Sequence, residues 1–220
     1  MFFRPATVED ASQLAEIHYL CRDRLPQSFM IELGVVFLTA YYRIILREKM
    51  TVILCAAAPA NHILGFVSGT ADATIEARVI RRAMFGLGAA ALLKLISKPT
   101  LGLKLIHRFK RPKAGANSFF IHPYGARVAF WGWRPDLSSG PNAIRLFQQW
   151  MKTMDGLGVD QVYGEVDADN SKLLRIHEVL GASRVRSYFT PEGRERILIV
   201  YPLSGKAGPQ NAAPNRNDHS

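Results

Sequence analysis

The sequence predicts an α/β domain built on a twisted sheet of mixed strand direction, with helices on its faces. Short apolar segments rich in β-branched residues alternate with longer segments in which apolar residues recur every three to four positions. The clearest case is a strand at residues 128–133, a short turn that contains Ser, Gly and Pro, and a helix that ends near Gly156. Strand and helix patterns in alternation are typical of this fold class. On the expected buried face of that helix lie Ile144, Phe147, Met151 and Met154.

Five elements are predicted in the N-terminal third of the chain. Thr7 and Asp10 have the spacing of a capping pair and open the first helix. Asn61 and His62 favour a turn between two β-rich segments, which indicates an antiparallel hairpin. In chain order we expect a strand at residues 2–6, a helix opened by Thr7, a helix at residues 31–48, and strands at residues 51–57 and 63–69.

The C-terminal part predicts one more strand, one more helix and a second hairpin. Asn170 is a typical helix cap, and Gly181 is a typical residue just after a helix. In chain order we expect a strand at residues 159–166, a helix from Asn170 to Leu180, and strands at residues 183–189 and 196–201.

Length and composition indicate one globular domain. The 220 residues can bury a sizeable core, and the hydrophobic fraction of 48% is typical of globular chains. We expect the domain at residues 1–203 and a disordered tail at residues 204–220. Cys21 and Cys55 stand far apart with no metal-ligand spacing, so we expect no disulfide, no metal site and a reducing compartment. Because no signal-peptide pattern or apolar run of spanning length occurs, we expect a cytoplasmic location.

A basic segment at residues 78–113 carries the charge asymmetry of the chain. It contains ten Lys and Arg residues, and no Asp or Glu occurs between Ala77 and Pro135. The formal net charge of the chain is +10, so the positive charge of this segment equals the whole excess of Lys and Arg over Asp and Glu. Its apolar residues predict two short amphipathic helices with a break near Pro99 and Gly102.

The turn before the central helix has the form of an anion site. Pro141 suits the first helical position, and Ser139 or Gly140 suits the cap before it. Unpaired N–H groups and the positive end of the helix dipole would then point at one place. The alternative is an ordinary strand-to-helix connection that binds nothing, because the turn is not rich in glycine.

Three stretches occur in an order and spacing that match a known family. Residues 170–182 read Asn-Ser-Lys-Leu-Leu-Arg-Ile-His-Glu-Val-Leu-Gly-Ala, residues 4–11 read Arg-Pro-Ala-Thr-Val-Glu-Asp-Ala, and residues 65–69 read Gly-Phe-Val-Ser-Gly. Together they resemble the GNAT superfamily, the GCN5-related N-acetyltransferases, across about residues 2–203. In the late motif of that family, Tyr stands at the position of His177 and Phe at the position of Ala182.

The resemblance implies a GNAT-type sheet, mixed and mostly antiparallel, with the basic helical segment inserted between the third and fourth strands. It implies acetyl-CoA as cofactor, with the pyrophosphate on the turn and the pantetheine arm where the fourth and fifth strands separate. A backbone N–H near Trp133 or Arg134 is the implied oxyanion donor. The implied cofactor-binding residues are Trp133, Arg134, Ser138, Ser139, Gly140, Asn142, Ala143 and Asn170.

The turn departs from the family pattern, which is Arg or Gln, two residues, Gly, one residue, and Gly or Ala. Ser138 stands at the first position, Pro141 removes an N–H at the glycine position, and Ala143 fits the last. Serine hydroxyls can supply donors instead. Two functions therefore stay open. One is an acetyl-CoA-dependent N-acetyltransferase acting on a small amine; the other is a GNAT-shaped binding or membrane-associated accessory protein with a degenerate cofactor loop.

The implied reaction is direct attack of an amine on a thioester, which needs a base, an oxyanion donor and a proton for the leaving thiolate. His177 is the candidate proton source, because it takes the position of the family's acid tyrosine and free imidazole titrates near neutral pH. Ordinary packing on its helix face is the alternative. Glu165 is the candidate general base; exposure to solvent, pairing with an arginine, or a water chain acting instead are the alternatives. Asn170 is expected to cap its helix as well.

Aromatic side chains and the basic segment are the candidates for the acceptor side. An acceptor pocket lined by His122, Tyr124, Trp131 and Trp133 is one interpretation, and core packing is the other. We prefer a lid role for the basic segment, because the family builds its acceptor pocket from loops near this connection. Peripheral contact with an anionic membrane through residues 78–113, or a protein-interaction surface, are alternatives. No nucleic-acid partner is expected, since no reading motif accompanies the charge. A homodimer stays open.

Overall fold

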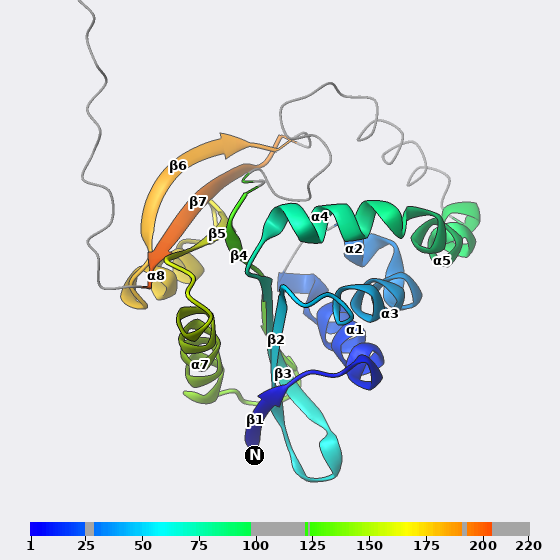
Figure 1. Ribbon diagram of the computed structural model, residues 1–220, viewed down its shortest axis with the longest axis horizontal. Helices are drawn as coiled ribbons and strands as arrows, with labels where there is room; N and C mark the ends of the chain where they lie inside the picture. Colours follow the sequence, from blue (N-terminus) through cyan, green and yellow to red (C-terminus); the bar gives the residue numbers. More distant parts are fainter. Residues whose placement is uncertain (25–28, 98–121, 123, 191–192, 204–220) are drawn as a thin grey trace, which may run out of the picture.

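The computed structural model describes residues 1–24, 29–97, 122, 124–190 and 193–203. Within this part of the chain, seven strands form one sheet in the order β1-β2-β3-β4-β5-β7-β6 (Figure 1). Neighbouring strands are antiparallel except β4 and β5, which are parallel, so the predicted mixed and mostly antiparallel sheet is confirmed. The strands are β1 (Phe2–Pro5), β2 (Thr51–Ala57), β3 (Ile63–Thr70), β4 (Ala126–Trp133), β5 (Gln161–Asp167), β6 (Ser183–Phe189) and β7 (Glu195–Pro202).

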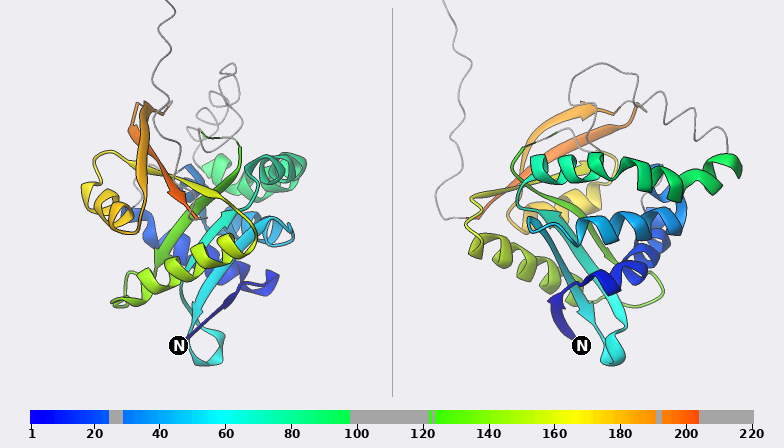
Figure 2. Two further views of the ribbon diagram at one scale, coloured as in Figure 1. Left: turned by 60° about the vertical axis from the view of Figure 1, so that its left-hand side comes forward. Right: turned by 45° about the vertical axis from the view of Figure 1, so that its right-hand side comes forward.

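Helices cover both faces of the sheet (Figure 2). On one face, helices from the first half of the chain pack against Ile53, Phe66 and Phe130. On the other face, α7 and α8 pack against Val67, Val162 and neighbouring apolar residues. The described α-helices are α1 (Ala11–Leu20), α2 (Phe29–Glu32), α3 (Gly34–Ile45), α4 (Ala73–Arg82), α5 (Met84–Ser97), α7 (Asn142–Gly156) and α8 (Ser171–Val179).

The capping pair at the first helix forms as predicted. The Thr7 N–H donates to the Asp10 carboxylate at 2.8 Å, and Arg4 pairs with the same carboxylate at 2.7 Å. By contrast, the single helix predicted at residues 31–48 is wrong. It is divided into α2 and α3 where Gly34 adopts a φ of +87°, a conformation that glycine allows at little steric cost.

The helical segment after β3 begins earlier than predicted. α4 starts at Ala73, not near Arg78, because Asp72 Oδ1 accepts hydrogen bonds from the N–H groups of Thr74 and Ile75 at 2.8 and 3.3 Å. α4 and α5 meet at Ala83. The break predicted near residues 99–102, the rest of the basic segment and the tail at residues 204–220 lie outside the described residues.

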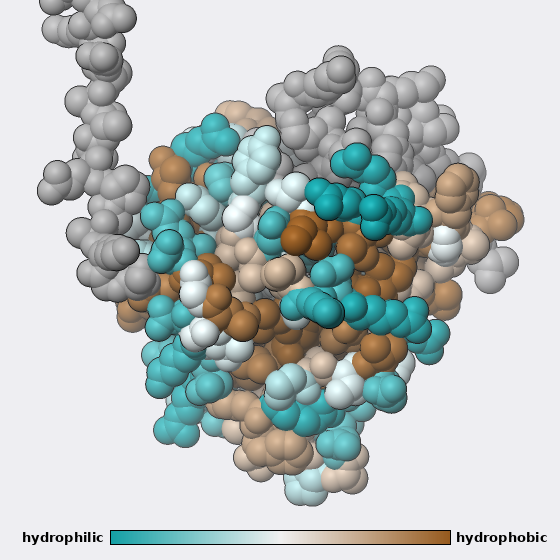
Figure 3. All heavy atoms as spheres, viewed as in Figure 1, coloured by the Kyte–Doolittle hydropathy of each residue, from teal (hydrophilic) through white to brown (hydrophobic). Residues whose placement is uncertain are grey.

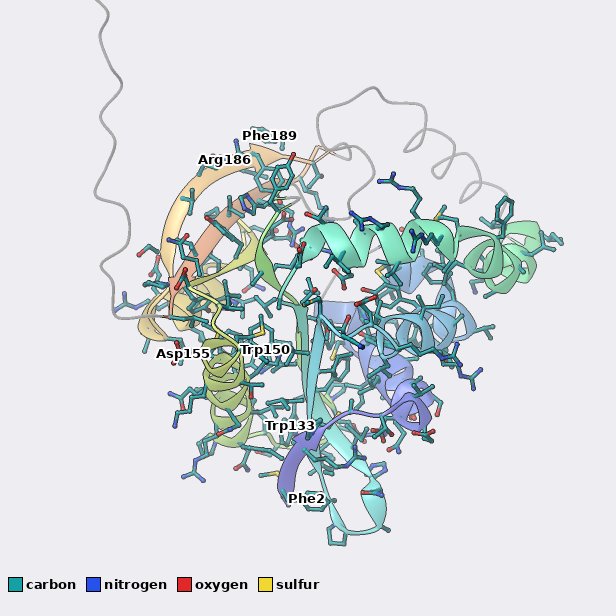
Figure 4. All side chains as sticks on the ribbon, in the orientation of Figure 1. Phe2, Trp133, Trp150, Asp155, Arg186 and Phe189 are labelled. Atoms are coloured by element: carbon teal, nitrogen blue, oxygen red, sulfur yellow. The ribbon has the colours of Figure 1, made fainter. Side chains whose placement is uncertain are left out.

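α7 is held firmly against the sheet. It begins at Asn142, one residue after Pro141, and its buried face contains Phe147, Trp150 and Met154, whereas Ile144 is partly exposed instead of buried. Trp150 lies between α7 and β2 (Figure 4), and its Nε1–H donates to the Val52 carbonyl at 2.9 Å. The middle of this helix is therefore fixed relative to β2.

The two glycines of residues 65–69 are required by close packing against tryptophan rings. A Cβ atom on Gly65 would lie 2.5 Å from the Trp133 ring, and one on Gly69 would lie 2.5 Å from the Trp150 ring. Because real Cβ atoms do not approach rings so closely, these positions need glycine. None of the helices in the described ranges combines the length and apolar character needed to cross a bilayer.

Candidate functional site

A gap opens between β4 and β5. The two parallel strands pair only at Ala126 with Val162 and at Arg127 with Tyr163. Immediately afterwards β4 carries a bulge: Gly69 of β3 lies opposite Val128 and Ser68 opposite Phe130, so Ala129 is an extra residue. A bulge bends its strand and ends regular pairing. From residue 128 onward β4 therefore follows β3 and leaves β5.

Backbone groups of β4 point into this gap. The Arg134 N–H donates to the Leu64 carbonyl at 2.8 Å, which fixes a hydrogen-bonded pair at the end of the β3–β4 ladder. Such pairs alternate with pairs whose polar groups point outward, so the N–H and C=O groups of Trp133 and Trp131 point away from β3. The Trp133 carbonyl accepts from Cys21 Sγ at 3.6 Å. Since the Arg134 N–H is engaged, Trp133 is the better of the two implied oxyanion donors.

The turn between β4 and α7 is shaped by Gly140. This residue has a φ of +48°, in the left-handed region that favours glycine. The Asn142 N–H donates to the Ser139 carbonyl at 3.0 Å, so the backbone amide of this implied cofactor-binding residue already has a partner. Ser138 is exposed, and its hydroxyl is accessible to solvent.

Other amides of this turn remain available. Trp131 ties the turn to the strand, because its Nε1–H donates to the Ala143 carbonyl at 3.2 Å. Arg145 is exposed on the first turn of α7 and adds a positive charge there. Within the described residues, no hydrogen-bond partner occurs for the N–H groups of Ser139, Gly140, Ala143 and Ile144. Free amides at a helix N-terminus next to a positive side chain form an anion-binding arrangement.

Four ring side chains connect the two sides of the gap on the face covered by α7. Trp131 comes from β4, Phe147 from α7, His177 from α8 and Tyr201 from β7, the strand paired with β5. The centroids of Trp131 and Phe147 lie 4.6 Å apart, and the His177 ring lies 5.8 Å from Trp131 and 6.0 Å from Tyr201. His177 therefore lies between a residue of β4 and a residue of β7, and its role as proton donor remains a prediction.

The environment of His177 differs from the expected one. Burial lowers the pKa of its imidazole to about 4, so the ring is neutral at pH 7 instead of partly protonated. Its Nδ1 shares a hydrogen bond with the Tyr201 hydroxyl. If the hydroxyl donates, the imidazole keeps its proton on Nε2; if Nδ1–H donates, the hydroxyl keeps its own. In both arrangements, one N–H or O–H proton of the pair is not used in the hydrogen bond between the two residues.

We expect the stability of the protein to fall as the pH decreases below about 6.5. Burial lowers the pKa of His18 to about 3 and that of His177 to about 4. The unfolded chain therefore binds protons first, and each histidine contributes a loss of roughly 2 kcal/mol between pH 6.5 and 5. Urea denaturation at a series of pH values measures this. His18→Gln and His177→Gln should each reduce the slope of the free energy of unfolding against pH, and the exposed His62→Gln should not. Equal slopes in all three variants would contradict the expectation.

Glu165 is buried and paired with an arginine, which was one of the alternatives for this residue. Its side chain is 3% exposed, Arg196 Nη1 lies 2.9 Å from Oε2, and the His122 backbone N–H lies 3.4 Å from Oε1. Both carboxylate oxygens of Glu165 have hydrogen-bond donors nearby. A proton taken up by this carboxylate would therefore displace one of these donors. The role of Glu165 as a general base remains a prediction. Burial and the nearby Glu165 carboxylate raise the pKa of Tyr188.

The remaining candidates do not gather at one place. Asn170 caps α8, with Oδ1 accepting from the Leu173 N–H at 3.0 Å. Trp131 and Trp133 pack on the α7 face, whereas His122 stacks on Tyr163 of β5, whose side chain alternates onto the opposite face. Tyr124 is exposed. Of the four residues proposed to line an acceptor pocket, Trp131 and Trp133 therefore lie on one face of the sheet and His122 on the other.

A buried ion pair marks the point where the gap begins. Arg127 is the last residue of β4 that pairs with β5, and its guanidinium pairs with Glu76 of α4. The two side chains are 6% and 1% exposed. This pair, like the partners Arg196 and Tyr201, could not be predicted from local sequence patterns, because each partner comes from a distant part of the chain.

Comparison with known proteins identifies the fold. No protein-family model and no curated protein sequence matches the chain. Among solved structures, YncA of Salmonella typhimurium, described as an acetyltransferase and containing its cofactor acetyl-CoA, is 12% identical with a TM-score of 0.57, over 96% of this chain and 98% of that one. A GNAT-family protein from Desulfovibrio desulfuricans is 8% identical with a TM-score of 0.57, over 92% and 99%. An aminoglycoside 6'-acetyltransferase of type Ii is 10% identical with a TM-score of 0.55, over 92% and 97%.

These similarities extend over nearly the whole of each chain and show that its architecture is shared with the three solved structures. The fold is that of the GNAT superfamily, which confirms the fold that the sequence resemblance implied.

Proposed function

We propose that this protein is an N-acetyltransferase that transfers an acetyl group from acetyl-CoA to the amine of a small molecule. The observation that carries the proposal is the separation of β4 from β5 after Arg127. A closed ladder would leave no backbone groups for a cofactor. Instead, the polar groups of Trp131 and Trp133 line one side of the gap, and free amides lie at the start of α7.

The residues present fit the cofactor. The N–H groups of Ser139, Gly140, Ala143 and Ile144 would bind the pyrophosphate, and the Ser138 hydroxyl and Arg145 would add a donor and a charge. The outward N–H and C=O groups of Trp131 would hold the pantetheine arm as a further strand would be held. Asn142 would contribute only through its side chain, because its N–H is engaged.

The chemistry follows from which groups remain free. Bound acetyl-CoA supplies an acyl group activated as a thioester. The Trp133 N–H is the donor we assign to the developing oxyanion. The neutral His177–Tyr201 pair keeps one proton beside the gap for the leaving sulfur, and the burial of its rings excludes water. Glu165 is the candidate for receiving the proton of the amine.

The proposal also covers the class of the acceptor and the cellular location of the protein. The similar aminoglycoside acetyltransferase is named for a small amine substrate, which supports a small-molecule acceptor here. Cys21 and Cys55 are buried and form no disulfide with each other, which favours a reducing compartment such as the cytoplasm. A screen of amine acceptors that follows release of free thiol identifies the substrate class.

A bulky side chain at Gly140 tests the cofactor site. We expect micromolar binding of acetyl-CoA by calorimetric titration, and a Kd at least roughly tenfold higher in Gly140→Phe, since the ring would cover the free amides. Gly158→Phe is the matched control. Gly158 follows the other end of α7, and both glycines have a positive φ (+48° and +79°) with open space where a Cβ would be.

Both variants carry the same kind of backbone strain. A difference between their Kd values for acetyl-CoA therefore reports the position of the new ring and not the strain. A Kd in Gly158→Phe within about twofold of the parent, at equal thermal stability, supports the site. An absence of binding at millimolar acetyl-CoA would instead support the accessory protein with a degenerate loop.

A further inference from the structure

We propose that α5, together with the end of α4, binds the surface of an anionic lipid bilayer. The first observation is an apolar stripe that the fold leaves in solvent. Phe85 is 94% exposed, Leu92 is 54% exposed and Ile96 is 69% exposed. We call these three residues the α5 stripe. A phenylalanine so exposed on a folded domain is unusual unless something covers it.

The stripe occupies one face of the helix. Its members are seven and four residues apart, a spacing that aligns side chains along a helix of 3.6 residues per turn. The opposite face of α5 carries Leu87 and Ala91, which are 3% exposed and belong to the core beneath. α5 is therefore anchored to the domain on one side and presents apolar side chains on the other.

Positive charge adjoins the stripe. Arg78, Arg81 and Arg82 are exposed on the last turns of α4, which runs into α5 through Ala83. Figure 3 shows hydrophilic residues over α4 next to hydrophobic residues over α5. Across residues 77–135 the sequence has no Asp or Glu, so no acidic residue of this segment offsets these charges.

An anionic bilayer matches both features. An interfacial helix buries an apolar face at the boundary of headgroups and acyl chains, and each nearby Lys or Arg adds attraction to anionic lipids. A second copy of this chain would bring the same arginines together, which opposes association. The contact is peripheral, because no helix in the described residues has the length and apolar character to span a bilayer.

Co-sedimentation with vesicles tests the proposal. The protein should bind vesicles of phosphatidylcholine mixed with phosphatidylglycerol, and bind vesicles of phosphatidylcholine alone far more weakly. Replacing all three arginines of α4 by glutamine should weaken binding about a hundredfold, at roughly fivefold for each charge, and added salt should act in the same direction. Replacing Phe85, Leu92 and Ile96 by serine should reduce binding by at least roughly tenfold.

Matched replacements elsewhere on the surface serve as controls. Val179 on α8 is 73% exposed, so Val179→Ser removes an equally exposed apolar side chain away from α5. Lys152→Gln and Lys172→Gln remove exposed positive charges from α7 and α8. Neither change should alter binding. Circular dichroism and thermal unfolding confirm that each variant is folded, and no step depends on acetyl-CoA, so the result is independent of the proposed transferase activity.

Several results would overturn the membrane assignment. One is an absence of sedimentation with the anionic vesicles; another is equal sedimentation with neutral vesicles. Unchanged binding in the serine variant would show that the stripe has no part in it. If sedimentation velocity shows a dimer, and Phe85→Ser converts it to a monomer, the α5 stripe would serve self-association instead.

Discussion

Arg127→Met lowers the free energy of unfolding by about 3–5 kcal/mol, the largest single-site loss of stability we expect outside the apolar core. The substitution removes the partner of Glu76 and leaves a carboxylate that is 1% exposed without its guanidinium. A buried charge that loses its partner retains the full cost of its removal from water. Urea denaturation at pH 7 measures the loss as a shift of the midpoint at constant slope.

Two further variants separate this cause from a general effect of losing an arginine. Arg184→Met breaks a surface pair with Glu178 at 2.7 Å, in which the arginine side chain is 54% exposed, and should cost about 1 kcal/mol or less. Combining Arg127→Met with Glu76→Leu removes both charges and should restore much of the stability. If the double variant is as unstable as Arg127→Met alone, the uncompensated carboxylate is not the cause.

The position of this ion pair connects stability with the proposed site. Arg127 is the last residue of β4 paired with β5, and its partner Glu76 lies on α4, the helix that leads to the α5 stripe. The pair therefore holds the closed end of the gap and the base of the proposed membrane surface at once. Losing it should loosen both regions, because each depends on how α4 lies against β4.

Local patterns in the sequence predicted most elements of the fold. β2 has the predicted bounds, and the capping residues Thr7 and Asn170 begin their helices as expected. The cap of α4 also has a signal in the sequence, since Asp72 is one of the residue types preferred at a helix cap. The break before α3 depends on a positive φ at Gly34, which a continuous apolar spacing conceals.

The partners of the site residues could not be predicted in the same way. Glu165 meets Arg196 and His177 meets Tyr201 because β7 lies between β5 and β6. That strand order depends on contacts between distant parts of the chain, and the spacing of apolar residues along a single element does not predict it. The burial that lowers the pKa of His177 is likewise a property of the packed rings.

Tyr201→Phe and His177→Leu should each lower kcat by a factor of roughly 10² or more, since proton transfer by a positioned group contributes that much. The two residues share one hydrogen bond and act as a unit, so the double variant should be little slower than the slower single variant. KM for acetyl-CoA should change little. The measurement is steady-state thiol release with the acceptor that the screen identifies.

Tyr42→Phe is the matched control, because the Tyr42 hydroxyl and His18 Nδ1 form a similar buried pair at 2.8 Å within the core on the opposite face of the sheet. It should lose stability and keep its kcat. The pH profile adds an independent readout: since the pKa of His177 is lowered to about 4, its neutral form is retained from pH 8 down to about 5, and kcat should show no limb from this residue in that range. A limb near pH 6.5 that disappears in His177→Leu would show that the imidazolium is the working form, and the proton donor would then be the cationic ring and not the neutral pair.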